Sequence, residues 1–168
     1  MVNAKVLIPI VLLVVAGCNH SNDSSPYEEL LSRPPYSNLT DSIHQDSKND
    51  ELYFRRGMLL YQNNSNLPAL ADFKKAWSID KKENYAVGIS NILVADKPDS
   101  AISFIKTALK DLPESIPLQL NLIQVYANKH QAAEALATCD KLIKQQPKHV
   151  GVLMIKSDLL ESVAIWST

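Results

Sequence analysis

A 34-residue spacing of small residues and prolines constrains this chain more than any other feature of its sequence. Ala101 and Ala135 lie 34 residues apart, and so do Pro113 and Pro147. A fixed period of this length indicates a repeated supersecondary unit whose apolar face is buried against its neighbours rather than in one central core. Because proline stops helices and alanine lets helices cross closely, the sequence predicts pairs of short helices.

The ends of these helices follow from the turn residues between apolar runs. Ser115-Ile116-Pro117 and Asn66-Leu67-Pro68 supply a capping residue and a first-turn proline for two of them. The predicted helices of the repeated region span 50–62, 67–79, 83–95, 99–111, 116–128, 131–145 and 149–164. We also expect a short helix over 39–45 that packs onto the first of these.

From Asp50 onward the pattern resembles the tetratricopeptide repeat (TPR), a 34-residue helix–turn–helix unit. The second unit keeps Ala101, Ile105 and Ala108, and the third keeps Ala135 and Cys139. The resemblance implies an all-α fold, a right-handed α-solenoid of TPR units with about three full repeats and a helix at each end. With Asp50 as position 1, the family's positions 4, 8, 11, 20, 24 and 27 are Tyr53, Gly57, Leu60, Ala69, Phe73 and Ala76.

The second unit is shorter than the first. Ala69 and Ala101 are 32 residues apart rather than 34, so two residues are missing. We expect the deletion in the tight turn 96–99, where Pro98 restricts the backbone.

The last predicted helix, 149–164, is apolar on most of its sides. Leu153, Ile155, Leu159 and Leu160 leave few polar faces, although the terminal helix of a repeat array normally has a wetted outer side. We interpret it as the first helix of an incomplete fourth repeat. The alternatives are self-association through this apolar C-terminal helix and the covering of a hydrophobic groove.

The first eighteen residues carry a second resemblance. Lys5 precedes an apolar run over 6–16, which as a helix spans about 16 Å, too little for a bilayer core of roughly 30 Å. Val15-Ala16-Gly17-Cys18 resembles the lipobox of bacterial lipoproteins, which implies cleavage before Cys18 and acyl chains on its thiol. Asn19 after Cys18 favours the outer membrane, facing the periplasm.

The chain therefore divides into a lipoprotein signal peptide (1–17), a lipidated cysteine with a flexible tether (18–48) and a TPR array (49–168). The tether prediction rests on composition. Residues 19–35 are rich in Ser, Asn, Asp and Pro and bury too little apolar surface to offset their conformational entropy.

Composition and spacing argue against catalysis, a metal, a cofactor or nucleic acid. With 17 basic and 18 acidic residues the net charge is -1, so the chain has no basic field for nucleic acid. His20, His44, His130 and His149 are never at metal-ligand spacing. Cys139 lies on an apolar helix face, typical of a buried structural thiol. We therefore predict a non-enzyme.

The surface remains as the functional candidate. In the family, positions 2, 5, 9, 12 and 13 of each first helix line a concave groove. Phe54, Met58 and Tyr61 would suit an apolar peptide or helix, although packing of Phe54 and Met58 against 39–45 is an equal alternative. The candidate groove residues are Phe54, Met58, Tyr61, Gln62, Leu120, Gln124, Asn128, Met154 and Asp158.

These features together predict a membrane-anchored TPR lipoprotein that acts as a non-catalytic protein–protein interaction scaffold in the bacterial cell envelope. The family members that clamp acidic C-terminal peptides carry Lys and Asn where this chain has Phe54 and Met58, which argues against that ligand class. A cell-wall accessory factor that binds glycan or peptidoglycan is the alternative.

The lipobox leads to a fractionation experiment. Cys18→Ala removes the only atom that could accept the diacylglycerol, so the variant should leave the membrane fraction, either as soluble protein or as an uncleaved precursor. Immunoblots of separated membrane and soluble fractions check this. If the variant stays in the membrane fraction with the mobility of the unchanged chain, the lipoprotein assignment is wrong.

Overall fold

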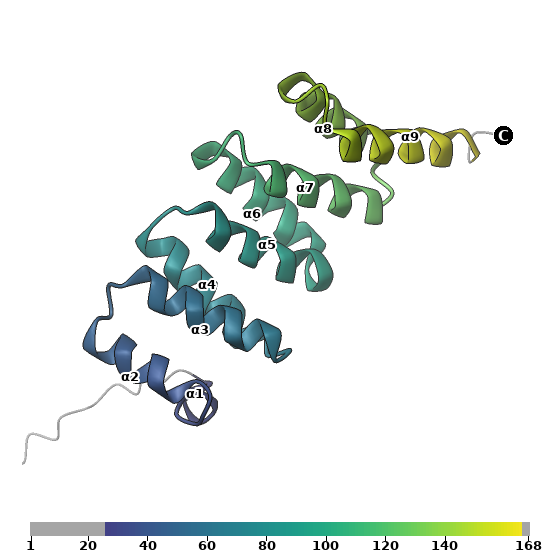
Figure 1. The fold of residues 1–168 in the computed structure, drawn as a ribbon. Coiled ribbons are helices and arrows are strands. Elements are labelled where there is room, and N and C mark those ends of the chain that lie inside the picture. Colours follow the sequence, from purple (N-terminus) through teal and green to yellow (C-terminus); the bar gives the residue numbers. More distant parts are fainter. Residues whose placement is uncertain (1–25, 166–168) are drawn as a thin grey trace, which may run out of the picture.

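The computed structural model describes residues 26–165, which form helices and no strands. Three antiparallel pairs, α3–α4, α5–α6 and α7–α8, are stacked in a row, with α1 and α2 at one end and α9 at the other (Figure 1). The helices are α1 Glu28–Leu31, α2 Ser37–Gln45, α3 Asp50–Gln62, α4 Asn66–Ile79, α5 Glu83–Asp96, α6 Pro98–Asp111, α7 Ile116–Asn128, α8 Ala132–Gln145 and α9 Val150–Ile165. The fold is a helical-repeat solenoid, as the sequence predicted.

The seven predicted helices of the array agree with the structure to within one residue at each end. Ser115 caps α7 as expected, since its hydroxyl accepts a hydrogen bond from the Leu118 amide at 3.3 Å. The cap predicted for α4 is wrong: Asn66 is the first helical residue, and Ser65 precedes it without a side-chain cap bond.

The turns within the units explain the shortened repeat. In the α3–α4 and α7–α8 turns the middle residue, Asn64 or His130, has a φ of 58° or 57°. This left-handed residue lets the next amide reach back into the helix, so that Ser65 N donates to Leu60 O and Gln131 N to Tyr126 O. Between α5 and α6 there is one residue, Lys97, instead of three. The deletion lies in the turn where the spacing placed it.

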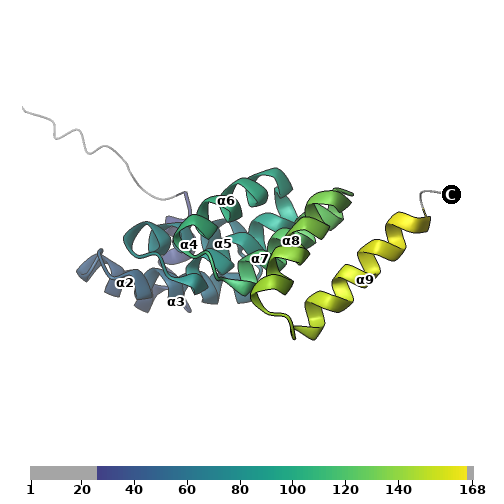
Figure 2. The same cartoon turned by 90° about the horizontal axis from the view of Figure 1, so that it is seen from above.

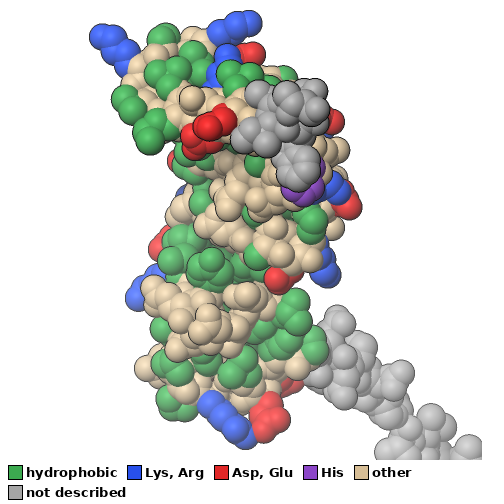
Figure 3. Space-filling view, turned by 90° about the vertical axis from the view of Figure 1, so that its right-hand side faces the viewer, with side chains coloured by type: hydrophobic (Ala, Val, Ile, Leu, Met, Phe, Trp, Pro, Cys, Tyr) green, Lys and Arg blue, Asp and Glu red, His purple; other side chains and the backbone are tan. Residues whose placement is uncertain are grey.

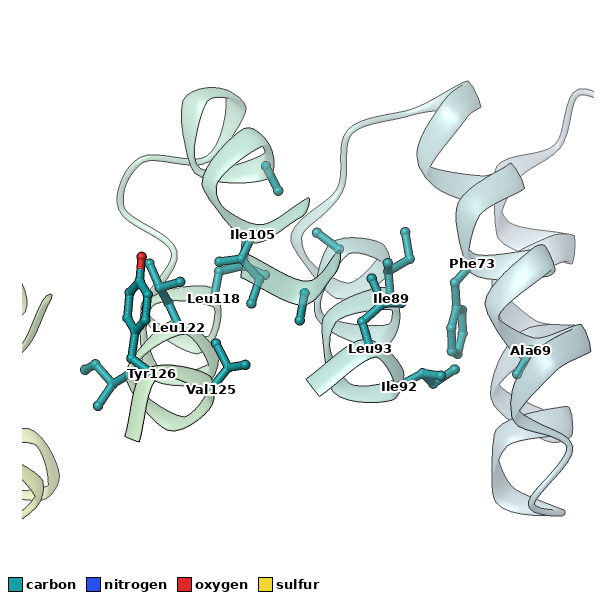
Figure 4. Close-up of a cluster of buried hydrophobic side chains, with 14 of the residues drawn as sticks. Ala69, Phe73, Ile89, Ile92, Leu93, Ile105, Leu118, Leu122, Val125 and Tyr126 are labelled. Carbon is teal, nitrogen blue, oxygen red and sulfur yellow. The ribbon is translucent and has the colours of Figure 1, made fainter. Parts of the chain in front are cut away.

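The core of the first two units is built around Phe73, which is fully buried. A Cβ added to Gly57 on α3 would lie 2.8 Å from Phe73 Cδ1, and one added to Gly88 on α5 would lie 2.9 Å from Cδ2. The backbones at Gly57 and Gly88 therefore lie against opposite edges of the Phe73 ring. Figure 4 shows Phe73 between Ala69 of its own helix and Ile89 and Ile92 of α5. The missing side chains let three helices approach the same aromatic ring.

A buried ion pair joins α3 and α4 and reaches the helices before them. Arg56 donates two hydrogen bonds to the Asp72 carboxylate, from Nε at 2.7 Å and Nη2 at 2.8 Å, and both residues are buried. Arg56 Nη1 also donates to the Thr40 hydroxyl of α2 at 2.9 Å, and this hydroxyl lies 2.8 Å from Leu31 O. Burial raises the pKa of Asp72, while the hydrogen bonds from Arg56 act in the opposite direction.

The stretch predicted as a flexible tether differs from the structure over its described part. Leu31 of α1 and Tyr36 are buried in the main core, and Ile43 of α2 packs with Tyr53 and Tyr85. The composition of 19–48 is polar on average, but these few apolar residues face the first repeat and gain enough burial to order the segment from Tyr27 onward. The helix expected over 39–45 is confirmed as the larger part of α2.

The glycine contacts with Phe73 predict a large cost for a single methyl group. Gly57→Ala or Gly88→Ala should destabilise the protein by about 1–3 kcal/mol, because the ring is held on both edges and cannot move aside. Chemical denaturation monitored by circular dichroism measures this change. The penalty should shrink in a Phe73→Leu background.

Gly151 of α9 is the matched control. A Cβ there would lie 3.4 Å from His149 Cε1, an ordinary contact, so Gly151→Ala should be neutral or stabilising by up to about 1 kcal/mol. Equal effects of alanine at Gly151 and at Gly57 would contradict the packing described around Phe73.

The buried pair predicts strong coupling between its two members. Arg56→Met should cost about 3–5 kcal/mol, because it leaves the Asp72 carboxylate buried and unpaired, whereas Arg56→Met/Asp72→Leu should recover most of that loss. Arg33→Met, which removes only the exposed pair with Glu29, should change the unfolding free energy by less than about 0.5 kcal/mol. Additive losses in the double variant would mean that the two side chains act independently.

Candidate partner-binding groove

Two of the groove residues predicted in the first repeat, Phe54 and Met58, pack partly against the protein itself. The Phe54 ring lies 4.9 Å from the Tyr85 ring and 5.8 Å from the Phe73 ring, centroid to centroid, and Met58 packs against the same core as Phe73. Both side chains are half-buried. The alternative expectation, packing against the 39–45 segment, fits Phe54, which contacts the cluster that includes Ile43 of α2. Tyr61 and Gln62 are exposed, and a partner-binding role for the four residues stays a prediction.

A polar cluster joins the first turns of α3 and α5 beside these rings. The Tyr85 hydroxyl donates to Asp50 at 2.5 Å, Lys82 pairs with the same carboxylate, and Glu51 lies 3.3 Å from the hydroxyl. The hydrogen bonds from Lys82 and Tyr85 hold the pKa of Asp50 below its ordinary value. Burial, followed by the bond to Asp50, raises the pKa of Tyr85 to about 12. The cluster couples unit one to unit two.

A hollow lies at the other end of the array, where α9 faces the end of α7. It has a volume of about 880 Å³, within the range of ligand-binding clefts. Its walls are mostly apolar, with three polar groups among them. The lining residues are Ala127, His130, Ala132, Ile155, Asp158, Leu159, Ser162 and Val163, which we call the α7–α9 groove.

The position of α9 opens this groove. Val152 anchors the start of α9 in the core, and Lys156 pairs with Asp140 of α8 at 2.5 Å. Figure 2 shows α9 angled away from α8 beyond the loop that joins them. The C-terminal half of α9 therefore stands off from the array and leaves Leu159 half-buried at the groove wall.

The structure brings only part of the predicted site together. Asp158, one of the predicted groove residues, lines the α7–α9 groove together with Ala127 of α7. Leu120 is half-buried against the core, and Gln124, Asn128 and Met154 are exposed outside the groove lining. Hydrophobic side chains are scattered along the face seen in Figure 3 instead of forming one continuous stripe.

The sequence-based prediction missed most of the groove wall. Ile155, Leu159 and Ser162 lie one helical turn apart on α9, on the side of Asp158, but the concave positions of the family do not include them. His130 lies in the groove because the left-handed turn of the third unit places it there. Asn64 has the same conformation at the equivalent turn of the first unit, so this backbone geometry belongs to the repeat and not to a ligand site.

The described residues offer little for other chemistry. Cys139 is fully buried, and burial raises the pKa of its thiol, which keeps it protonated at neutral pH. Within 26–165 no three His, Cys, Asp or Glu side chains come close enough to hold a metal ion. None of the helices in this part of the chain is long and apolar enough to cross a bilayer. Cys18 and its lipobox lie outside the described residues.

Comparison with known sequences supports the repeat assignment. Residues 93–159, from the end of α5 to the middle of α9, match the family described as tetratricopeptide repeat. No curated protein matches the sequence significantly.

Solved structures share the fold at low sequence identity. The crystal structure of MamA superposes with a TM-score of 0.66 and 16% identity over 75% of each chain. A tetratricopeptide repeat protein from Parabacteroides merdae gives 0.62 and 14% over 75% of this chain and 50% of that one. TTC0263, a thermophilic TPR protein in Thermus thermophilus, gives 0.59 and 19% over 80% of this chain and 76% of that one. These likenesses establish the architecture of the fold and do not identify a ligand.

Proposed function

We propose that this chain is a membrane-anchored, non-catalytic protein–protein interaction scaffold of the bacterial cell envelope. The proposal is supported by the match of residues 93–159 to the tetratricopeptide repeat and by the shared helical-repeat fold, since that repeat commonly serves protein–protein interaction. The α7–α9 groove holds a segment of a partner protein. The observation that carries this proposal is the groove itself, a hollow of about 880 Å³ with mostly apolar walls at the open end of the array.

The groove walls define the chemistry of the partner segment. Ala127 and Ala132 are small and leave room, while Ile155 and Leu159 provide apolar contact area. Asp158 is exposed and forms no ion pair with any of residues 26–165. A segment with one or two aliphatic side chains flanked by Lys or Arg fits best, because its cation can pair with Asp158 once the aliphatic groups are buried.

The first described helix and the groove lie at opposite ends of the array. The first helix after the N-terminal segment, α1, lies at the far end of the array from α9 (Figure 1). If acyl chains attach at Cys18, the eight residues 19–26 span at most roughly 30 Å before Tyr27 begins the folded region. The groove then faces away from the bilayer, where a periplasmic partner can reach it.

The mechanism is passive. The acyl chains confine the protein to the membrane, the packed repeats hold α7 and α9 in a fixed relation, and the groove retains its ligand near the surface. Confinement alone raises the local concentration of a bound partner relative to bulk solution. This role requires no chemical step and is consistent with a buried, protonated Cys139.

Site-specific photo-crosslinking in intact cells tests the proposal. A photoreactive amino acid at Leu159 should form adducts with one discrete partner, and Asp158→Lys should weaken their formation by roughly tenfold because it repels the partner's cation. Mass spectrometry of the adducts identifies the segment.

Two controls make the result specific. Glu134→Lys reverses an exposed carboxylate of α8 that does not line the groove and should leave the adducts unchanged. The same photoreactive group at Lys141, on the exposed side of α8, should give no discrete adduct. Adducts that form equally well from Lys141, or that ignore Asp158→Lys, would refute a binding role for the groove; adducts with glycan would favour the cell-wall alternative.

A further inference from the structure

The outer side of α9 carries an apolar stripe that is separate from the groove. Val150, Leu153 and Leu160 are 65%, 43% and 50% exposed, and Ser157 between them is exposed as well. The other side of the helix is already used, since Val152 is buried and Ile155 and Leu159 pack against the main core. A helix with apolar residues on both sides is expected to be covered on both.

The stripe occupies the positions that receive a second helix in the earlier units. Leu153, Ser157 and Leu160 come after the start of α9 by the same intervals at which Tyr53, Gly57 and Leu60 come after the start of α3. In α3 these three residues are buried, and Gly57 contacts Phe73 of the second helix. The stripe of α9 therefore has the composition and geometry of a helix-accepting face, with the small Ser157 at its centre.

The stripe also has the spacing of a short coiled-coil seam. Val150 and Ser157 occupy the a positions of two heptads, and Leu153 and Leu160 occupy the d positions. Lys156 and Glu161 fall at the flanking g and e positions, five residues apart. When two such helices pair in parallel, each Lys156 lies beside the Glu161 of the other copy, whereas antiparallel pairing puts like charges together.

We propose that two copies of this protein associate end to end through a parallel, two-fold pairing of their α9 helices. Each α9 covers the face that the second helix covers in the earlier units, although the two α9 helices run parallel whereas the helices within each unit run antiparallel. The self-complementary charge pattern favours a second copy over an unrelated helix, because both cross-helix ion pairs form at once. Lys156 has three donor hydrogens and can keep its bond to Asp140 at the same time. The α7–α9 groove lies on a different side of the helix and stays open.

Cysteine crosslinking of the full chain in expressing cells tests the pairing and its direction. Leu153→Cys and Leu160→Cys each place a thiol at a d position, so each variant alone should form a disulfide-linked dimer under copper–phenanthroline oxidation. Asp158→Cys, on the groove side of the same helix, should not. The unchanged chain, with Cys18 and Cys139, sets the background. The substituted side chains are exposed, so the fold should persist, and circular dichroism verifies it.

Charge reversal tests the register independently of the crosslink chemistry. In the Leu153→Cys chain, Glu161→Lys should lower dimer yield by roughly three- to tenfold, because it faces Lys156 of the other copy, whereas Glu161→Gln should lower it less. Dimers that form only between co-expressed Leu153→Cys and Leu160→Cys chains would overturn the parallel arrangement. Adducts with other proteins and no homodimer, or no crosslink at all, would overturn the proposed self-association. None of these outcomes depends on partner capture by the groove.

Discussion

The ring of Phe73 sets the distance between the first two units, because Gly57 and Gly88 leave no atoms between it and the neighbouring helices. The close approach that results puts Phe54 against both Phe73 and Tyr85, and it brings the first turns of α3 and α5 within reach of the Asp50, Lys82 and Tyr85 cluster. The Phe73 ring and the two glycines that face it therefore account for the close packing of the first two units. The same packing covers part of Phe54 and Met58, so the concave side of the first repeat has no continuous exposed apolar stripe.

The opposite end is open for a related reason. The last helix has a first neighbour, α8, but the positions that would receive a second helix remain exposed. Held by Val152 and by the Lys156–Asp140 pair, α9 presents two different surfaces: an inner side that forms the groove and an outer stripe with heptad spacing. The groove and the stripe therefore both lie at the α9 end of the described array.

The agreement between sequence and structure depends on the range of the interactions involved. Helix limits, the shortened α5–α6 turn and the buried alanines follow from local spacing, so the sequence predicts them almost to the residue. The Arg56–Asp72–Thr40 contact joins residues 16 apart on either side of Arg56, and no motif marks it. For the same reason the polar composition of this segment did not predict α1 or the full extent of α2. The few apolar side chains of these helices are buried only by contact with the first repeat, which is a long-range interaction.

The sequence by itself determined the repeat and its helices, because a 34-residue period and helix-stopping prolines act within single units. Only the tertiary structure decided which concave positions stay open, because that depends on whether a neighbouring helix supplies an aromatic ring. In the first repeat, the rings of Phe73 and Tyr85 pack against Phe54. At the other end of the array, Asp158 and Leu159 line an open groove.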